Sequence, residues 1–204
     1  MTVRHSRPGR PRHIQEDTSG RTPREQILDA SAQLFVSQGF AATSTREIAE
    51  DVGIRQASLY YHFAGKDEIL AELLDMTVRP ALEALTEIAE IEGDAERLYA
   101  LALHDATALS KLMHNIGILP SLPDVESSEY EVARNDLRRT YATLGVACAS
   151  QAVKDTVSKN QLGDLLITMV ESVVGSRADG DRITEVELHA VAAACLRVCG
   201  VPVT

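Results

Sequence analysis

One stretch of 23 residues constrains the fold of this chain more than any other part of the sequence. Residues 44–66 read Ser-Thr-Arg-Glu-Ile-Ala-Glu-Asp-Val-Gly-Ile-Arg-Gln-Ala-Ser-Leu-Tyr-Tyr-His-Phe-Ala-Gly-Lys. The pattern predicts a short helix, a turn centred on Gly53 and a second short helix that buries Leu59 and Phe63. Two short helices joined by a tight turn form a helix-turn-helix, whose second helix fits the major groove of DNA.

The limits of these helices are marked by residues that satisfy free backbone groups. Ser44 and Glu47 form a capping box at the start of the first helix, and Gly53 favours its end. Upstream, the run Thr22 to Glu25 predicts the start of a preceding helix that ends at Gly39. The apolar positions predicted to face a shared three-helix core are Ile27, Ala30, Leu34, Phe35, Ile48, Ala49 and Val52.

These segments together resemble the tetracycline-repressor (TetR) family of bacterial transcription regulators. The resemblance covers about residues 22–72, roughly a quarter of the chain, and the remainder carries no comparable signature. The motifs that carry it are Leu34-Phe35 with Gly39-Phe40, Thr43 to Ala49, Val52-Gly53-Ile54, Leu59 to Phe63, and Lys66.

The resemblance implies a role for each polar side chain of the motif. Gln56 and Ser58 are expected to contact base edges, since a glutamine side chain can form a bidentate pair of hydrogen bonds with adenine. Tyr60 is expected to contact either a base or a phosphate. Tyr61 and His62 are expected to contact phosphates. The same holds for Thr43, Ser44 and Thr45 at the start of the first helix of the motif, and for Lys66 at the start of the helix that follows the motif. The alternative is a solvated polar face. The expected DNA contacts are Thr43, Ser44, Thr45, Arg46, Arg55, Gln56, Ser58, Tyr60, Tyr61, His62 and Lys66.

The N-terminal segment, residues 1–21, lacks apolar periodicity and is predicted to be a flexible basic arm. Arg10 and Arg12 lie in a Gly-Arg-Pro-Arg sequence similar to segments that enter narrow minor grooves. A solubilising tail without DNA contacts explains the same composition equally well.

Charge is distributed unevenly along the 204 residues. The chain has a net charge of −10, yet residues 1–66 hold nine basic and seven acidic residues, whereas residues 67–204 hold eleven basic and twenty-three acidic ones. An acidic body repels DNA and therefore favours docking through the N-terminal end.

No apolar run is long enough to span a bilayer, so no membrane partner is predicted. Three cysteines without metal-binding spacing fit reduced thiols, and we expect a cytoplasmic protein.

The rest of the chain is predicted to be helical, which gives an all-α fold. Helices are expected near 66–91, 94–116, 126–157, 160–176 and 182–199, with Asp179-Gly180-Asp181 between the last two. Pro80 is expected to kink or divide its helix, and Gly145 to bend the longest one. We therefore assign three regions: a basic arm at 1–21, a DNA-binding domain at 22–65, and a ligand-binding and dimerisation domain at 66–204.

The last two helices carry broad apolar stripes. Such a pair suits a four-helix bundle with a second subunit, although some of these residues must serve the core of their own chain. The family resemblance favours a homodimer, which would place two reading helices on a palindromic site. The stripes comprise Leu162, Leu165, Leu166, Met169, Val170, Val173 and Val174, and then Ile183, Val186, Ala190, Val191, Ala194, Cys195 and Val198.

A ligand cavity is expected within residues 98–174, where Leu, Ile and Met predominate and polar groups are scattered. We expect an apolar effector, neutral or weakly acidic. Its predicted contacts are Leu101, His104, Leu109, Met113, His114, Arg138, Tyr141 and Met169, with Asn115 as a further polar group and Leu112, Ile116, Leu137 and Leu144 as further walls.

No motif for catalysis, metal binding or a cofactor is found in the sequence. We therefore predict a dimeric DNA-binding regulator, more specifically a repressor that a small molecule releases from operator DNA. Two alternatives stay open at this point: a ligand-insensitive DNA-binding architectural protein and an all-helical enzyme.

Overall fold

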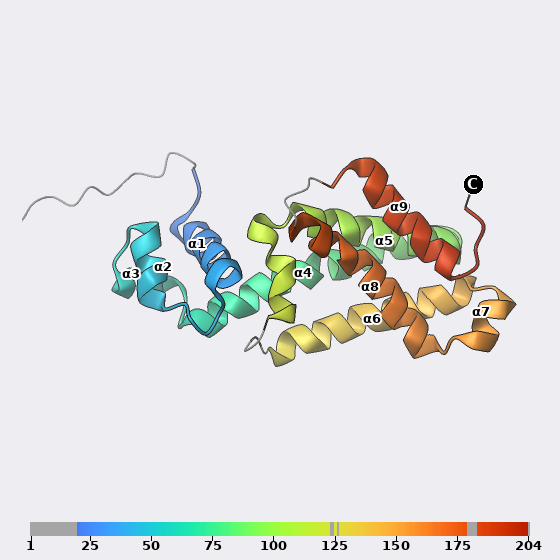
Figure 1. Ribbon diagram of the computed structural model, residues 1–204, viewed down its shortest axis with the longest axis horizontal. Coiled ribbons are helices and arrows are strands. Elements are labelled where there is room, and N and C mark those ends of the chain that lie inside the picture. The colour runs from blue at the N-terminus through green and yellow to red at the C-terminus, as the bar shows by residue number, and fades with distance from the viewer. Residues whose placement is uncertain (1–19, 123–124, 126, 179–182, 204) are drawn as a thin grey trace, which may run out of the picture.

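The computed structural model describes residues 20–122, 125, 127–178 and 183–203. These residues form nine α-helices and one 3-10 helix, with no strand among them, which confirms the predicted all-α class. Figure 1 shows an elongated molecule, with a small unit of three helices at one end and a larger helical body at the other. One long helix runs from the small unit into the body.

The small unit begins and ends its helices where the sequence predicts. Thr22 and Ser44 each accept a hydrogen bond from the amide three residues on, and the glutamate there bonds back to the cap. Gly53 ends the second helix with φ 79° and ψ 20°, a left-handed conformation that favours glycine. The helices are α1 (Pro23–Gln38), α2 (Thr45–Val52) and α3 (Gln56–His62).

Apolar side chains from all three helices meet in one core beneath α3. Each large side chain buried there contributes about 1.5–3 kcal/mol to folding. Leu34 and Val52, which the sequence pattern also places on buried faces, are only half-buried. The fully buried side chains of this core include Ile27, Phe35, Ile48, Leu59 and Phe63.

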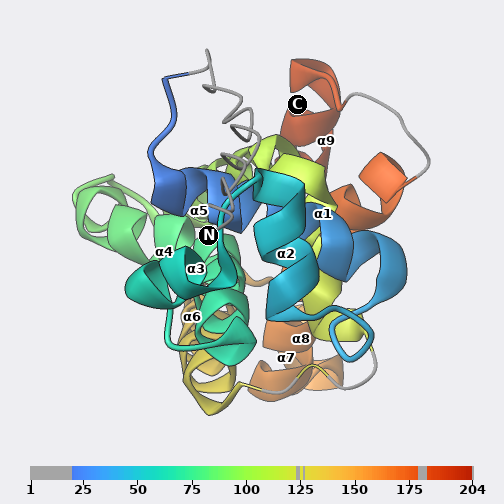
Figure 2. The same cartoon turned by 90° about the vertical axis from the view of Figure 1, so that its left-hand side faces the viewer.

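The long helix α4 (Lys66–Ala89) belongs to both parts of the molecule. Near its start Ile69 and Leu73 are buried within reach of α1, and further along Val78 and Ala81 are buried in the body. Pro80 does not divide it, because the helix continues on both sides of the proline. Viewed from the end in Figure 2, α1, α2 and α3 lie in front of the body that α4 enters.

The helix expected over 94–116 stops earlier. It is replaced by α5 (Asp94–Lys111) and the 3-10 helix η1 (Met113–Ser121). Arg177 explains the early end, since its guanidinium donates to the carbonyls of Leu109 and Leu112. At the start of η1, His114 and Asn115 have φ of 45° and 55°, a left-handed conformation uncommon for residues other than glycine.

The helix expected over 126–157 is two helices, α6 (Ser128–Cys148) and α7 (Gln151–Thr156). The break falls at Ser150, which caps α7 and whose amide donates to the Cys199 carbonyl 2.9 Å away. Gly145 lies inside α6, which continues to Cys148. A Cβ atom at Gly145 would lie 2.7 Å from Leu166 Cδ1, so this glycine allows a neighbouring helix to approach closely.

The final pair is α8 (Lys159–Ala178) and α9 (Glu185–Val198), while the turn at Asp179–Asp181 lies outside the described residues. Most of the α8 stripe is buried against its own chain, so that part serves the core, whereas Leu165 remains exposed. On α9, Cys195 is buried, but Val186 is 78% exposed and Ala190 is exposed as well.

The cysteines of the chain are free thiols. None of the described helices is both long and apolar enough to cross a bilayer.

Candidate nucleic-acid interface and effector cavity

The outer face of α3 is an exposed polar and aromatic surface at the far end of the small unit. Leu59 and Phe63 point into the core, as predicted, whereas Tyr60 and Tyr61 are 50% and 87% exposed. Tyr61 packs edge-on against His62, with ring centroids 5.3 Å apart. Exposed aromatic side chains usually find a contact surface, so this face has the character of an interface.

A hydrogen-bond network joins α2 to α3 at this surface. Thr45 Oγ1 accepts a hydrogen bond from Gln56 Nε2 at 2.9 Å and lies 3.1 Å from Tyr60 Oη. The Gln56 side chain is therefore held in one orientation. Its second N–H and its Oε1 have no partner in the described part of the chain and can meet the two groups of an adenine edge.

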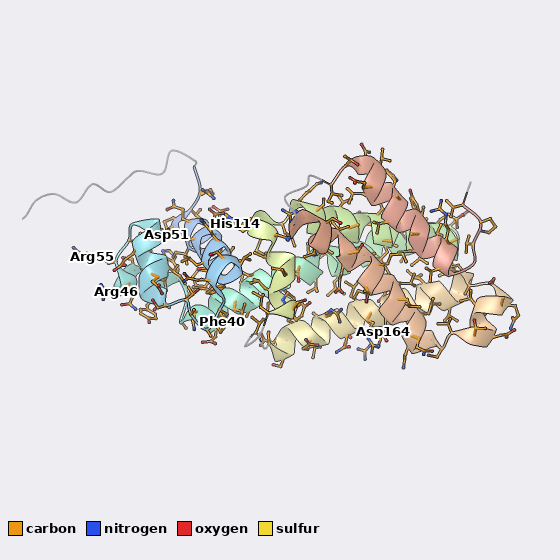
Figure 3. The ribbon with its side chains drawn as sticks, viewed as in Figure 1. Phe40, Arg46, Asp51, Arg55, His114 and Asp164 are labelled. Carbon is orange, nitrogen blue, oxygen red and sulfur yellow. The ribbon has the colours of Figure 1, made fainter. Side chains whose placement is uncertain are left out.

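Two arginines flank this network. Arg55 is the N-cap of α3 without a side-chain cap, and Figure 3 shows it together with Arg46 at the outer end of the unit, away from the body. Arg46 Nε donates to Glu50 Oε1 at 2.9 Å, and this contact raises the pKa of Arg46. Ser58 is exposed beside them. The arrangement places two exposed guanidinium groups at the rim of the α3 surface.

The side chains of Thr43 and Lys66, both predicted phosphate contacts, make hydrogen bonds inside the protein. Thr43 is 2% exposed and its hydroxyl donates to the Gly39 carbonyl at 2.8 Å. Lys66 Nζ donates to the carbonyls of Phe40 and Thr43 at 3.0 and 3.2 Å, with a third at Ala41, and lies over the Phe40 ring. Because its three donors are used inside the protein, Lys66 connects the α1–α2 loop to the start of α4 instead.

Ser44 remains at the surface, but its hydroxyl is occupied within the capping box. Ser44 Oγ and its amide both donate to Glu47 Oε2, at 2.7 and 2.8 Å, which lowers the pKa of Glu47. A phosphate at this helix start would compete with the Glu47 carboxylate. Arg10 and Arg12, the expected minor-groove residues of the arm, lie outside the described residues.

The body holds a small cavity of about 20 Å³ between α4, α5, η1, α6 and α8. Asp105 lines it and is only 3% exposed. Tyr141 Oη donates to Asp105 Oδ2 at 2.9 Å, and burial raises the pKa of Asp105 to about 7 despite that bond. Glu171 lines the same cavity and pairs with Arg134 at 2.8 and 2.9 Å. The remaining lining residues are Thr77, Val78, Leu109, Gly117, Tyr130, Leu137, Ile167 and Val174.

The lining overlaps the expected ligand site only in part, and that site stays a prediction. Leu109 and the expected wall residue Leu137 line the cavity, and Tyr141 reaches it through Asp105, while Leu101 is buried in the core. His104 is exposed and donates to the Pro80 carbonyl at 3.1 Å, and Arg138 pairs with Asp164. Met113 and Met169 are half-buried outside this lining. The lining also contains two carboxylates, which the expectation of an apolar or weakly acidic ligand does not include.

His114, another expected ligand contact, lies between the body and the small unit. Its Nε2 donates to Asp29 Oδ1 on α1 at 3.0 Å, and Arg21 Nη1 lies 2.8 Å from the other Asp29 oxygen. Figure 3 places His114 beside α1. The adjacent Asn115 donates to the carbonyl of Val174, a residue that lines the cavity. A continuous set of contacts therefore leads from the cavity to α1.

Sequence reasoning missed Asp105 and Glu171 because each sits among apolar residues in a helical pattern without a recognisable motif. A buried acid at a core-facing position is the signal that could have found them, since aspartate is seldom fully buried unless paired. The contacts of Arg177 with Leu109 and of Asp29 with His114 gave no signal at all, because the two residues of each pair lie more than sixty residues apart.

Comparisons with known proteins agree with this geometry. A sequence model of the "Bacterial regulatory proteins, tetR family" matches residues 27–73. AmtR of Mycobacterium smegmatis superposes on the chain with a TM-score of 0.81 and 38% identity, covering 93% of this chain and 92% of AmtR. The chain belongs to the TetR family. The likeness to AmtR is decisive because it spans both the small unit and the body.

Other TetR-family relatives match less of the chain. The transcriptional repressor KstR2 of Rhodococcus jostii is 43% identical over 60 residues, so the match spans 29% of this chain and 29% of KstR2. A structure of AibR in complex with isovaleryl coenzyme A and operator DNA superposes with a TM-score of 0.66 at 19% identity, over 87% of this chain and 97% of AibR, and shows a shared fold. This TetR-family protein is thus a helix-turn-helix transcriptional regulator and not an enzyme.

Proposed function

We propose that this protein is a repressor that binds a palindromic operator as a homodimer and is released by a small-molecule effector. The observation that carries the proposal is the α3 surface, where Thr45 fixes Gln56 beside exposed Tyr60 and Tyr61. Recognition of base edges in the major groove requires an exposed helix with a side-chain amide held in a fixed orientation, and α3 with Gln56 has this arrangement.

In this proposal α3 enters the major groove and its residues divide the work. Gln56 and Ser58 contact bases, while Tyr61, His62, Arg46 and Arg55 contact phosphates, and Tyr60 supports Gln56 through Thr45. The amides at the start of α2 near Ser44 and Thr45 add a further phosphate contact. Arg10 and Arg12 of the arm, residues 1–21, reach the neighbouring minor groove.

The dimer interface is assigned to the outer faces of α8 and α9. Leu165, Val186 and Ala190 are exposed apolar side chains on those helices, and covering them with a second copy removes apolar area from water. A two-fold axis there places two α3 helices on half-sites one or more helical turns apart. Residues 22–65 then form the DNA-binding domain, and residues 66–204 the domain for ligand and dimerisation.

Effector control is supported by the cavity and by its connection to the small unit. AibR, which shares this fold, has been crystallised with both isovaleryl coenzyme A and operator DNA. In the present protein, Asn115 and His114 link the cavity wall at Val174 to Asp29 on α1. A ligand that fits the cavity better when η1 has moved would shift the population away from the DNA-binding state.

The operator is to be selected from a random duplex pool and its affinity measured by fluorescence anisotropy. We expect one dimer per palindrome, and an affinity that falls steeply with salt because phosphate contacts release counterions. Arg55→Ala should flatten the salt dependence, whereas Arg139→Ala on the exposed face of α6 is the matched control and should not. Failure to select any specific site would refute base reading. Specific DNA binding that no ligand alters would favour a ligand-insensitive architectural protein.

A further inference from the structure

Asp105 is a buried carboxylate with unused capacity to accept hydrogen bonds. An ionised carboxylate accepts about four hydrogen bonds, and the structure gives this one a single donor, Tyr141 Oη on Oδ2. No donor reaches Oδ1 within the described residues. Burying a charged group without partners is costly, and a buried polar group left in this state marks a place where a ligand or water binds.

The groups around Asp105 set the sign of the charge that the cavity favours. Glu171 lines the same cavity, and the nearby guanidinium of Arg134 is held in a two-point pair with Glu171. Thr77 and Tyr130 add hydroxyl groups to the lining, and the Thr77 hydroxyl, which donates to the Leu74 carbonyl at 2.6 Å, remains an acceptor. The uncompensated charge of the lining is therefore the negative charge of Asp105.

We propose that this cavity binds a small cation with several N–H donors, an ammonium or amidinium group, which donates to Asp105. The inference rests on the proposed function, because it names the chemistry of the effector that would release the DNA. An anionic or purely apolar ligand would leave the Asp105 charge unpaired, or would add a second charge of the same sign beside it.

The dimensions of the cavity limit the ligand. About 20 Å³ is the space of one water molecule, so an ammonium nitrogen enters without movement of the walls, whereas an amidinium group requires the walls to separate. The wall at Gly117 is tightly packed, since a Cβ atom there would lie 2.6 Å from Val174 Cγ2. A larger group has to separate η1 from α8, and η1 is the element that contacts α1.

The protonation state of Asp105 gives the ligand a measurable signature. Burial holds the pKa of Asp105 near 7, so the carboxyl is partly protonated at neutral pH in the free protein. A bound cation favours the carboxylate and lowers that pKa, so binding releases a proton and weakens as the pH falls. The titratable groups that face Asp105 from the neighbouring helices are Tyr130, Arg134 and Tyr141 on α6, Glu171 on α8 and Cys195 on α9.

The test compares three small molecules of nearly the same shape: acetamidinium, acetamide and acetate. Binding to the full-length protein is measured by calorimetry at constant ionic strength, in buffers of different ionisation enthalpy to count protons. We expect acetamidinium to bind about 10- to 100-fold more tightly than acetamide, as for a charge-assisted hydrogen bond, with release of a proton, and acetate not to bind. Tighter binding of acetate, or equal binding of all three, would overturn the proposal.

Asp105→Asn keeps the shape of the side chain and removes its charge, and should abolish the preference for acetamidinium. Asp155→Asn, at an exposed position of α7, is the matched control and should preserve it. If Asp105→Asn does not fold, the proton release of the unmodified protein decides the question by itself. Release of operator DNA is measured separately. If acetamidinium binds at Asp105 without releasing DNA, the cation site is supported and effector control through it is contradicted. If acetamidinium does not bind, the cation site is overturned, while the proposed repressor function is not affected.

Discussion

At the scale of single residues, Thr45 organises the reading surface through one hydroxyl group. Thr45→Val keeps the shape of the side chain but removes the acceptor that holds Gln56 and the partner of Tyr60. Gln56→Ala should cost about 1–3 kcal/mol of discrimination at one base pair. We expect Thr45→Val to lose part of the same discrimination, because the amide of Gln56 becomes free to rotate. Anisotropy competition with single-base operator variants measures both.

Thr45→Ser is the control for this pair, since it restores the hydroxyl and should restore the discrimination. A uniform loss of affinity across all operator variants, for both Gln56→Ala and Thr45→Val, would show that Gln56 does not read a base. The positions in the operator where the two variants act should also coincide, because they alter one contact.

Lys66 gives a second prediction at this scale, because its ammonium group is hydrogen-bonded inside the protein. Lys66→Met keeps the aliphatic stem over Phe40 but leaves the carbonyls of Phe40, Ala41 and Thr43 without their charged donor. We expect a loss of about 1.5–3 kcal/mol in the free energy of unfolding. The salt dependence of DNA binding by the folded fraction should not change, whereas Arg55→Ala should change it and leave stability intact. Denaturant titrations and anisotropy separate the two effects.

At the scale of helices, the contact between α6 and α8 depends on Gly163. A Cβ atom at Gly163 would lie 2.7 Å from Ala142 Cβ and 2.9 Å from the Arg138 carbonyl oxygen. Gly163→Ala should therefore destabilise the protein by about 1–3 kcal/mol, since the backbone of α6 cannot yield as a side chain can. Gly175→Ala on the same helix has open space and should stabilise by up to about 1 kcal/mol through helix propensity. Thermal unfolding at one protein concentration compares them, and equal effects would exclude close packing as the cause.

The helices also show where sequence reasoning succeeds. Caps and turns act over four or five residues, so Ser44 with Glu47 and the left-handed Gly53 could be predicted from their neighbours alone. The ends of α5 and α6 could not, because Arg177 and the Cys199 carbonyl set them from distant parts of the chain. The candidate site divides in the same way. The exposed face of α3 follows from local periodicity, whereas the surroundings of Lys66 and Asp105 are defined by partners far away in the sequence.

At the scale of the whole molecule, the buried carboxyl of Asp105 links the stability of the fold to pH. Burial raises the pKa of Asp105 from 3.8 to about 7, with a smaller contribution from Glu171, while the bond from Tyr141 opposes the rise. The native state therefore keeps a proton that the unfolded chain has lost between about pH 4 and pH 7. The stabilisation associated with that proton is complete below pH 4 and is lost as the pH rises through 7.

Asp105→Asn should remove this dependence, because the amide has no charge to bury and can still accept the Tyr141 hydrogen bond. The free energy of unfolding of the variant relative to the unmodified protein should rise by about 2–3 kcal/mol between pH 5 and pH 7, at about 1.4 kcal/mol for each pH unit, and level off above about pH 7. Burying the N–H groups of the new amide can lower the stability of the variant by an amount that does not depend on pH. Such an amount does not alter the change of this difference with pH. Urea titrations at pH 5, 6, 7 and 8 measure it, with Asp155→Asn as the surface control. A difference that stays level across this range would mean that Asp105 is ionised throughout, and that the cavity already supplies the positive partner we assign to the ligand.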